Sequence, residues 1–174
     1  MILVSHNVYL SPVSANDADA VVECMRDKEI YNNTMRIPFP YSYEDARLWL
    51  EDSIIFEEEN GFNRNFAIRN ETGKMMGVIG FHFNYGVRAE KSEIGYWLGK
   101  AYWNRGNMTS VVKKFCAIAK EQYDMKILEA YVFDFNNPSQ KVLLKAGFTE
   151  KERLPKWFKK DGQKVDAVKF VMLL

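Results

Sequence analysis

One strand–loop–helix segment constrains the fold of this chain more than any other part. The apolar run from Glu93 to Leu98 predicts a strand, and the small and polar residues 99–108 predict a loop. Apolar residues then recur at helical spacing, so we expect a helix that begins at Thr109, with this residue as a candidate N-cap. A helix N-terminus reached through a glycine-containing loop can bind phosphate, because its first N–H groups lack partners. Gly106 permits a close backbone approach and Arg105 adds a cation, although an ordinary connecting loop is the alternative.

The chain after this helix alternates again between strand and helix. Residues 126–133 predict a strand, and Asn136 or Asn137 can cap a short helix that has Pro138 at its first position and stops at Gly147. A hairpin with arms at about 150–158 and 164–173 follows, around the turn Asp161-Gly162.

The first half of the chain predicts a similar mixture of elements. We expect a strand at 8–10, a helix from the capping box Ser14–Asp17 to about Arg26, and an irregular aromatic segment at 31–43. A second helix runs from Ser42 or Tyr43 to about Glu59, and two strands at 65–69 and 74–83 follow. Residues 1–174 are therefore expected to form a single α/β domain with a mixed, mostly antiparallel sheet of about six or seven strands and four helices.

Composition excludes several classes of function. The 174 residues are 47% hydrophobic and 27% charged, with a net charge of +1, so no nucleic-acid partner is implied. No apolar run approaches the roughly 18 residues of a membrane span, and the N-terminus is too short and uncharged for a signal peptide, which favours a cytoplasmic location without membrane partners. Cys24 and Cys116 lie among apolar neighbours and are expected to be inert thiols, with no disulfide and no metal site.

Taken together, five motifs resemble the GNAT superfamily, the Gcn5-related N-acetyltransferases, and are most similar to its ribosomal-protein N-terminal acetyltransferase branch. The resemblance covers roughly the last half of the chain, with a looser match before it. Trp103 and Met108 depart from the family's phosphate loop, which carries Gln or Arg at the position of Trp103 and a small residue, Gly or Ala, at the last position, that of Met108. The motifs are Glu-Ile-Gly-Tyr-Trp-Leu at 93–98, Tyr-Trp-Asn-Arg-Gly-Asn-Met-Thr at 102–109, Asn-Asn-Pro-Ser at 136–139, Lys-Ala-Gly-Phe at 145–148 and Lys-Asp-Gly-Gln-Lys-Val-Asp at 160–166.

The resemblance implies direct transfer of an acetyl group from acetyl-CoA, as co-substrate, to a primary amine in a ternary complex. The pyrophosphate would bind the backbone at 105–109, and the pantetheine arm would pair with the strand edge at 97–99. Asn136 would hydrogen-bond that arm, and Ser139 would contact the arm or the sulfur. The alternative for Ser139 is an ordinary hydroxyl at the start of a helix. The implied cofactor-binding residues are Trp97, Leu98, Arg105, Gly106, Asn107, Met108, Thr109, Asn136 and Ser139.

The amine must lose a proton, and Glu93 is the leading candidate for the base, with a simple strand-start carboxylate as the alternative. His82, Asp134 and water remain open as bases. Leu143 stands where several family members have a tyrosine that protonates the thiolate, which leaves Ser139 as the second candidate catalytic residue. By the same resemblance, the aromatic segment 31–43 and Trp157-Phe158 would line the acceptor site. The alternative is that these aromatic side chains only fill the core.

The expected acceptor is a protein N-terminal α-amine, because its pKa near ~8 makes it easier to deprotonate than a lysine amine near ~10.4. An acetyltransferase for small amines such as polyamines, antibiotics or amino acids is the first alternative, although the acidic run Glu57–Glu59 is more simply a solvated helix end. A catalytically silent CoA-binding module is the second alternative. The sequence is compatible with a monomer or a homodimer.

Overall fold

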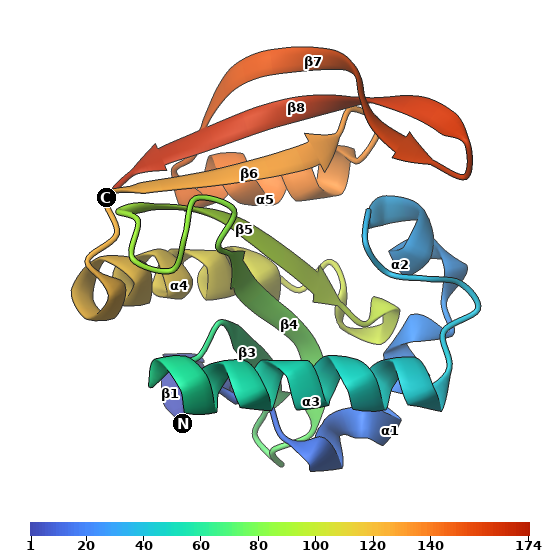
Figure 1. Ribbon diagram of the computed structural model, residues 1–174, viewed down its shortest axis with the longest axis vertical. Coiled ribbons are helices and arrows are strands. Elements are labelled where there is room, and N and C mark those ends of the chain that lie inside the picture. Colours follow the sequence, from blue (N-terminus) through green and yellow to red (C-terminus); the bar gives the residue numbers. More distant parts are fainter. The chain divides into compact units, whose positions relative to one another are not determined.

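The computed structural model describes all 174 residues (Figure 1). They divide into two compact units. Unit 1 comprises residues 1–80 and 96–107, and unit 2 comprises residues 81–95 and 108–174. The strands follow the order β1-β2-β3-β4-β5-β6-β8-β7, and β5–β6 is a parallel pair among mostly antiparallel ones. The mixed, mostly antiparallel α/β fold is confirmed, with eight strands and five α-helices.

Unit 1 packs three helices against antiparallel strands around one apolar core. Helix α3 begins after the capping box of Ser42 and Asp45 and ends at Gly61, whose φ of 75° closes the helix in the left-handed conformation. The core gathers buried side chains of α1, α3, β3 and β4, such as Val21, Leu50 and Val78. The elements are β1 Ile2–Ser5, β2 Val8–Pro12, α1 Ala18–Met25, α2 Lys28–Asn33, α3 Tyr43–Asn60, β3 Asn65–Asn70 and the larger part of β4 Met75–His82.

Two short elements of unit 1 are absent from the sequence-based expectation. Strand β1 pairs with β2 through a turn in which Asn7 has a φ of 61°, a conformation that asparagine tolerates better than most residues. Helix α2 occupies the start of the segment expected to be irregular, and Asp27 caps it by accepting the N–H of Glu29 at 2.9 Å. Both elements are too short for their hydrophobic pattern alone to reveal them.

A buried ion pair ties the start of α1 to β3. The Arg69 guanidinium donates to both carboxylate oxygens of Asp17, at 2.7 and 2.9 Å, and the two side chains are only 13% and 7% exposed. Burial opposes ionisation of Asp17, but the bonds from Arg69 and Ser14 outweigh it and lower its pKa. The pair therefore stabilises the fold above the usual pKa of an aspartate, and this contribution is lost as the pH falls below that value.

We expect Arg69→Met to lower the free energy of unfolding by about 3 kcal/mol, because it leaves the Asp17 carboxylate buried without a counter-charge. Arg47→Met is the matched control. Arg47 pairs with Glu44 on the exposed face of α3, where such pairs contribute about 0–1 kcal/mol. Urea unfolding of both variants measures the difference, and equal losses would contradict the role given to the buried pair.

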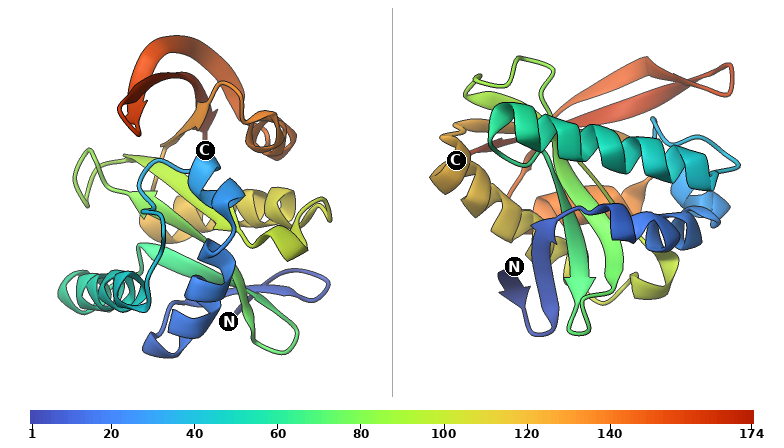
Figure 2. Two further views of the ribbon diagram at one scale, coloured as in Figure 1. Left: turned by 90° about the vertical axis from the view of Figure 1, so that its right-hand side faces the viewer. Right: turned by 60° about the horizontal axis from the view of Figure 1, so that its bottom comes forward.

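Unit 2 places both of its helices on one side of its strands, as Figures 1 and 2 show. Phe81, in the end of β4 that belongs to unit 2, packs against Phe115 of α4 with 4.5 Å between ring centroids. Strand β6 pairs with β8 over its whole length but with β5 only over Lys91–Glu93. The elements are the larger part of β5 Lys91–Leu98, α4 Asn107–Tyr123, β6 Ile127–Phe133, α5 Asn137–Ala146, β7 Thr149–Lys160 and β8 Gln163–Leu173.

The two cysteines are free thiols, as expected. Cys116 is buried in α4 and Cys24 is partly buried in α1. Burial raises the pKa of Cys24 to about 11 and that of Cys116 to about 12, so both remain protonated and unreactive near neutral pH. None of the helices combines the length and the apolar character needed to cross a bilayer.

Candidate active site

The loop before α4 has the geometry of an anion-binding turn. Gly106 adopts a φ of 77°, and α4 begins at the next residue, Asn107. The prediction that the helix begins at Thr109 is wrong by two residues, since the left-handed glycine turns the chain directly into the helix. Thr109 is therefore the third helical residue, and it offers a backbone N–H rather than a side-chain cap.

The surroundings of this turn fit a pyrophosphate. The first four residues of α4, 107–110, carry the N–H groups that no helical carbonyl can pair with, and the helix dipole favours negative charge there. A Cβ placed on Gly106 would meet no atom within 4 Å, so the space beside the turn is open. Met108 is buried among the apolar residues of α4. The Arg105 guanidinium donates to the carbonyl of Ala101 at 2.9 Å and closes the loop.

The end of β5, proposed as the edge for the pantetheine arm, is partly engaged within unit 1. The indole Nε1 of Trp103 donates to the carbonyl of Leu98 at 2.5 Å, and the N–H of Gly99 donates to the carbonyl of Met76 at 2.8 Å. Trp97 and Trp103 pack against the unit 1 core. An extended ligand can therefore use only the remaining backbone groups of this segment.

Glu93 lies at the point where β5 stops pairing with β6. Its register partner on β6 is Glu129, and this is the last rung of the parallel pair. The half-buried Glu93 accepts a hydrogen bond at Oε2 from the Asn84 amide at 2.7 Å. Side chains alternate along a strand, so Glu93 lies on the opposite face from Ser92 and Ile94, which are buried. The strand-start carboxylate is thus held in place rather than fully solvated.

Glu129 is a functional candidate that the sequence did not reveal. Its carboxylate is 3% exposed and accepts bonds from Lys91 at 3.0 Å, Lys169 at 2.8 Å and the Tyr85 hydroxyl at 2.6 Å. Burial opposes the charge, but these bonds outweigh it and lower the pKa of Glu129 to about 2. One signal was available, because Glu129 is the only charged residue in the run 127–133, which is otherwise apolar or aromatic.

Asn136 and Ser139 form the start of α5. The Asn136 Oδ1 accepts the backbone N–H of Ser139 at 3.2 Å, so Asn136 is the N-cap, one of the two residues predicted for that role. Pro138 is the second helical residue and not the first as predicted, because the helix already begins at Asn137. Gly147 closes the helix with a φ of 106°, as expected. Leu143 is fully buried in α5, so the position of the family's tyrosine serves the core here.

The cap contact makes the predicted role of Asn136 testable. If its NH₂ group also donates to the pantetheine arm, Asn136→Ala costs about 1–3 kcal/mol of acetyl-CoA binding, as expected for an unpaired polar group. Asn136→Asp is the matched control, because it keeps the capping oxygen and removes only the NH₂ donor. Calorimetry should show weaker binding in both variants, with thermal stability retained in Asn136→Asp. Unchanged binding in both variants would leave Asn136 with the capping role alone.

The remaining candidate residues fall into both units. Asp134 accepts a bond from Arg153 at 2.6 Å, which makes it a surface ion pair as well as a possible base. The His82 ring lies against Gly95, where an added Cβ would approach Nε2 to 2.3 Å. In unit 2, Trp157 stacks on Tyr131 with 5.9 Å between centroids and is 55% exposed. In unit 1, Tyr41 of the segment 31–43 packs against the core.

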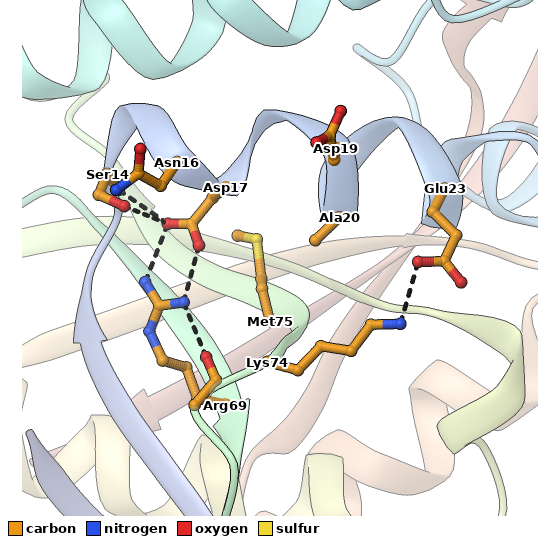
Figure 3. Close-up of a pocket in the computed structure, with 10 residues that line it drawn as sticks. Ser14, Asn16, Asp17, Asp19, Ala20, Glu23, Arg69, Lys74 and Met75 are labelled. Carbon is orange, nitrogen blue, oxygen red and sulfur yellow. Dashed lines mark hydrogen bonds and ion pairs between the residues drawn. The ribbon is translucent and has the colours of Figure 1, made fainter.

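A separate pocket of about 420 Å³ lies in unit 1, between the start of α1 and the β3–β4 turn (Figure 3). Four of its charged groups form two ion pairs, Asp17 with Arg69 and Glu23 with Lys74, and Asp19 also lines it. None of the residues that line it is among the predicted cofactor or catalytic residues. The predicted site residues instead divide between the units. Unit 1 holds Trp97, Leu98, Arg105, Gly106 and Asn107, and unit 2 holds Glu93, Met108, Thr109, Asn136 and Ser139.

Comparison with solved structures supports the fold. The chain superposes with a TM-score of 0.88 on RimL, a ribosomal L7/L12 alpha-N-protein acetyltransferase solved with coenzyme A, at 17% identity over 99% of this chain and 97% of RimL. It superposes with a TM-score of 0.84 on the microcin C7 self-immunity acetyltransferase MccE, solved with acetyl-CoA and AMP, at 19% identity over 98% of this chain and 94% of MccE.

Sequence comparison identifies the family. The chain is 25% identical to the uncharacterized N-acetyltransferase YoaA of Bacillus subtilis, over 95% of this chain and 93% of YoaA. It is 26% identical to the uncharacterized N-acetyltransferase p20 of Bacillus licheniformis, over 98% and 95% of the two chains. The sequence profile of the acetyltransferase (GNAT) domain matches residues 7–149. The chain therefore belongs to the GNAT family of acyltransferases, which use acetyl-CoA as co-substrate and an amine as acceptor.

Proposed function

We propose that this protein, as one acetyltransferase domain over residues 1–174, acetylates the N-terminal α-amine of a protein or peptide. The observation that supports acetyl-CoA binding is the left-handed conformation of Gly106 directly before α4, with open space where a Cβ would stand. The backbone N–H groups of residues 107–110 would bind the pyrophosphate. The segment of β5 beyond Glu93, where its pairing with β6 has ended, would offer backbone groups to the amide-bearing pantetheine arm, in the manner of an added strand.

Glu93 would act as the general base. It takes a proton from the ammonium form of the acceptor, and the nitrogen keeps the electron pair with which it attacks the acetyl carbon. The bound acetyl-CoA supplies the activated acetyl group and the thiolate leaving group. Ser139 would donate a hydrogen bond to the sulfur, since Leu143 carries no proton that could be transferred there.

The α-amine is favoured as acceptor for two reasons. Its pKa near ~8 lets a single carboxylate deprotonate it close to neutral pH, whereas a lysine amine near ~10.4 is more difficult to deprotonate. The similarity to RimL, whose name describes an alpha-N-protein acetyltransferase, agrees with this choice. The similarity to MccE, solved with AMP, favours a small-molecule amine as the second candidate.

A panel of acceptors distinguishes these functions. Release of free CoA thiol is followed with acetyl-CoA and four acceptors: a peptide with a free N-terminus, the same peptide with a blocked N-terminus and an internal lysine, spermidine, and a free amino acid. We expect the free-N-terminus peptide to react at least about tenfold faster than the others, a difference of about 1.4 kcal/mol in transition-state energy. Preference for spermidine or the amino acid would establish the small-amine function. Acetyl-CoA binding without any turnover would establish a silent module.

A further inference from the structure

Two neighbouring residues of the loop between β4 and β5 bond two glutamates that lie side by side. The Asn84 amide donates to Oε2 of Glu93 at 2.7 Å, and the hydroxyl of the next residue, Tyr85, donates to Oε2 of Glu129 at 2.6 Å. Glu93 and Glu129 are register partners on β5 and β6, so their side chains share one face of the sheet. The loop, residues 83–90, is therefore tied at two successive positions to the strands beside it (Figure 1).

Glu129 has the properties of a permanent anchor. It is buried, and its other oxygen, Oε1, accepts bonds from Lys91 at 3.0 Å and Lys169 at 2.8 Å. These two ammonium groups keep the carboxylate charged although it is out of contact with water. Glu129 is therefore charged near neutral pH, where it accepts the Tyr85 hydroxyl and is not itself a proton acceptor.

Tyr85 is held by two contacts of different kinds. Besides the hydroxyl bond to Glu129, its ring lies 4.3 Å from the Nζ of Lys91, within the range of a cation–π contact. The ring itself is 46% exposed, so apolar burial contributes little to its position. Asn84 directly precedes Tyr85 in the chain. Because the Tyr85 hydroxyl is bonded to Glu129, the positions that the Asn84 amide can reach are restricted.

We propose that Asn84 is a positioning residue for Glu93, and that the bond between Tyr85 and Glu129 holds Asn84 in place. The proposal rests on the proposed role of Glu93 as the base. A hydrogen bond at Oε2 sets the plane of the Glu93 carboxylate, and with it the direction of the oxygen that receives the proton of the amine. The bond also favours the charged form of Glu93, which is the form able to accept that proton.

Other titratable groups lie on the same face as Glu93. Lys91 lies two residues earlier on β5, and Glu129 lies on β6. Lys169 lies on β8 and pairs with Glu129. His82 lies on β4, with its ring against Gly95. None of these groups is altered by a change at Asn84, and Tyr85→Phe keeps the ring that Lys91 contacts. A shift in the titration of Glu93 in these variants therefore reports the loss of the bonds themselves.

The test compares Asn84→Ala, Asn84→Gln and Tyr85→Phe with the wild-type protein, with Tyr9→Phe on β2 as a control for loss of a tyrosine hydroxyl elsewhere. We expect kcat to fall about tenfold in Asn84→Ala and less in Tyr85→Phe, with unchanged acetyl-CoA affinity, because a hydrogen bond to a charged group is lost. The acidic limb of the pH profile should move to higher pH. Asn84→Gln, which retains an amide donor, should recover part of the rate, and Tyr9→Phe should behave as wild type.

A measurement without catalysis separates this inference from the proposed acceptor. NMR titration of ¹³C-labelled glutamate, with Glu93 assigned through Glu93→Gln, should show a higher titration midpoint for Glu93 in Asn84→Ala. If Glu93→Gln is slow but the Asn84 and Tyr85 variants keep the wild-type rate, pH profile and titration, the positioning role is overturned while the base assignment survives. If Glu93→Gln turns over at the wild-type rate, both the base assignment and the positioning role are overturned.

Discussion

We expect Glu93→Gln to lower the maximal rate of acetyl transfer by about 10²–10⁴-fold, the usual contribution of a general base. The substitution keeps the shape of the side chain and its position at the end of the β5–β6 pair, and it removes the charge that accepts the proton. Acetyl-CoA affinity should stay nearly intact. The rate should recover in part at high pH, where the free amine forms without help.

Steady-state rates from pH 6 to 10, with the acceptor that the panel identifies, measure this effect. Glu90→Gln is the matched control, because Glu90 is an exposed glutamate just before the same strand. It should show the wild-type profile. A wild-type rate for Glu93→Gln near pH 7 would transfer the role of base to His82, Asp134 or water.

The second large effect is expected from Gly106→Val. A β-branched side chain is strained at a φ of 77°, and its Cβ would project into the open space where the pyrophosphate is proposed to bind. Loss of one or more hydrogen bonds to a charged phosphate would weaken acetyl-CoA binding by about 10–100-fold. Calorimetric titration of the folded variant with acetyl-CoA measures the change.

Gly162→Val separates strain from blocked binding. Gly162 lies in the β7–β8 turn with the same φ of 77°, and an added Cβ there also meets no atom within 4 Å. Both variants should lose similar thermal stability, but only Gly106→Val should lose acetyl-CoA affinity. An unchanged affinity in Gly106→Val would place the pyrophosphate elsewhere.

Local signals in the sequence were sufficient for most helices and turns. Ser42 with Asp45, Asn136, Gly61 and Gly147 each mark a helix end through a contact or a φ angle that involves only a few neighbouring residues. The hairpin turn at Asp161-Gly162 is of the same kind. The start of α4 was one exception, because the periodic apolar residues begin later than the helix that carries them, and the short helix α2 was another.

The candidate site was predictable in part. The turn at Gly106 and the cap at Asn136 follow from motifs within one short segment, and both have the predicted local geometry. The hydrogen bonds from Asn84 to Glu93 and from Tyr85 to Glu129 do not follow from such motifs, because they join residues that are 9 and 44 positions apart in the chain. The contacts of Asp17 were likewise predictable only in part. Its capping contact with Ser14 is local and was expected, whereas its ion pair with Arg69 spans 52 positions and was not.

The sequence by itself thus determined the family, the order of the elements and the candidate phosphate turn, because each depends on short motifs and on periodicity along the chain. Only the tertiary structure decided that Glu93 is the last residue of β5 paired with β6, and that Glu129 is a buried charge with two lysine partners. Strand register and burial arise from contacts between segments far apart in the chain. A glutamate within an apolar strand has the same local sequence whether it is exposed, paired or catalytic, and its environment is set by the strands that pack beside it.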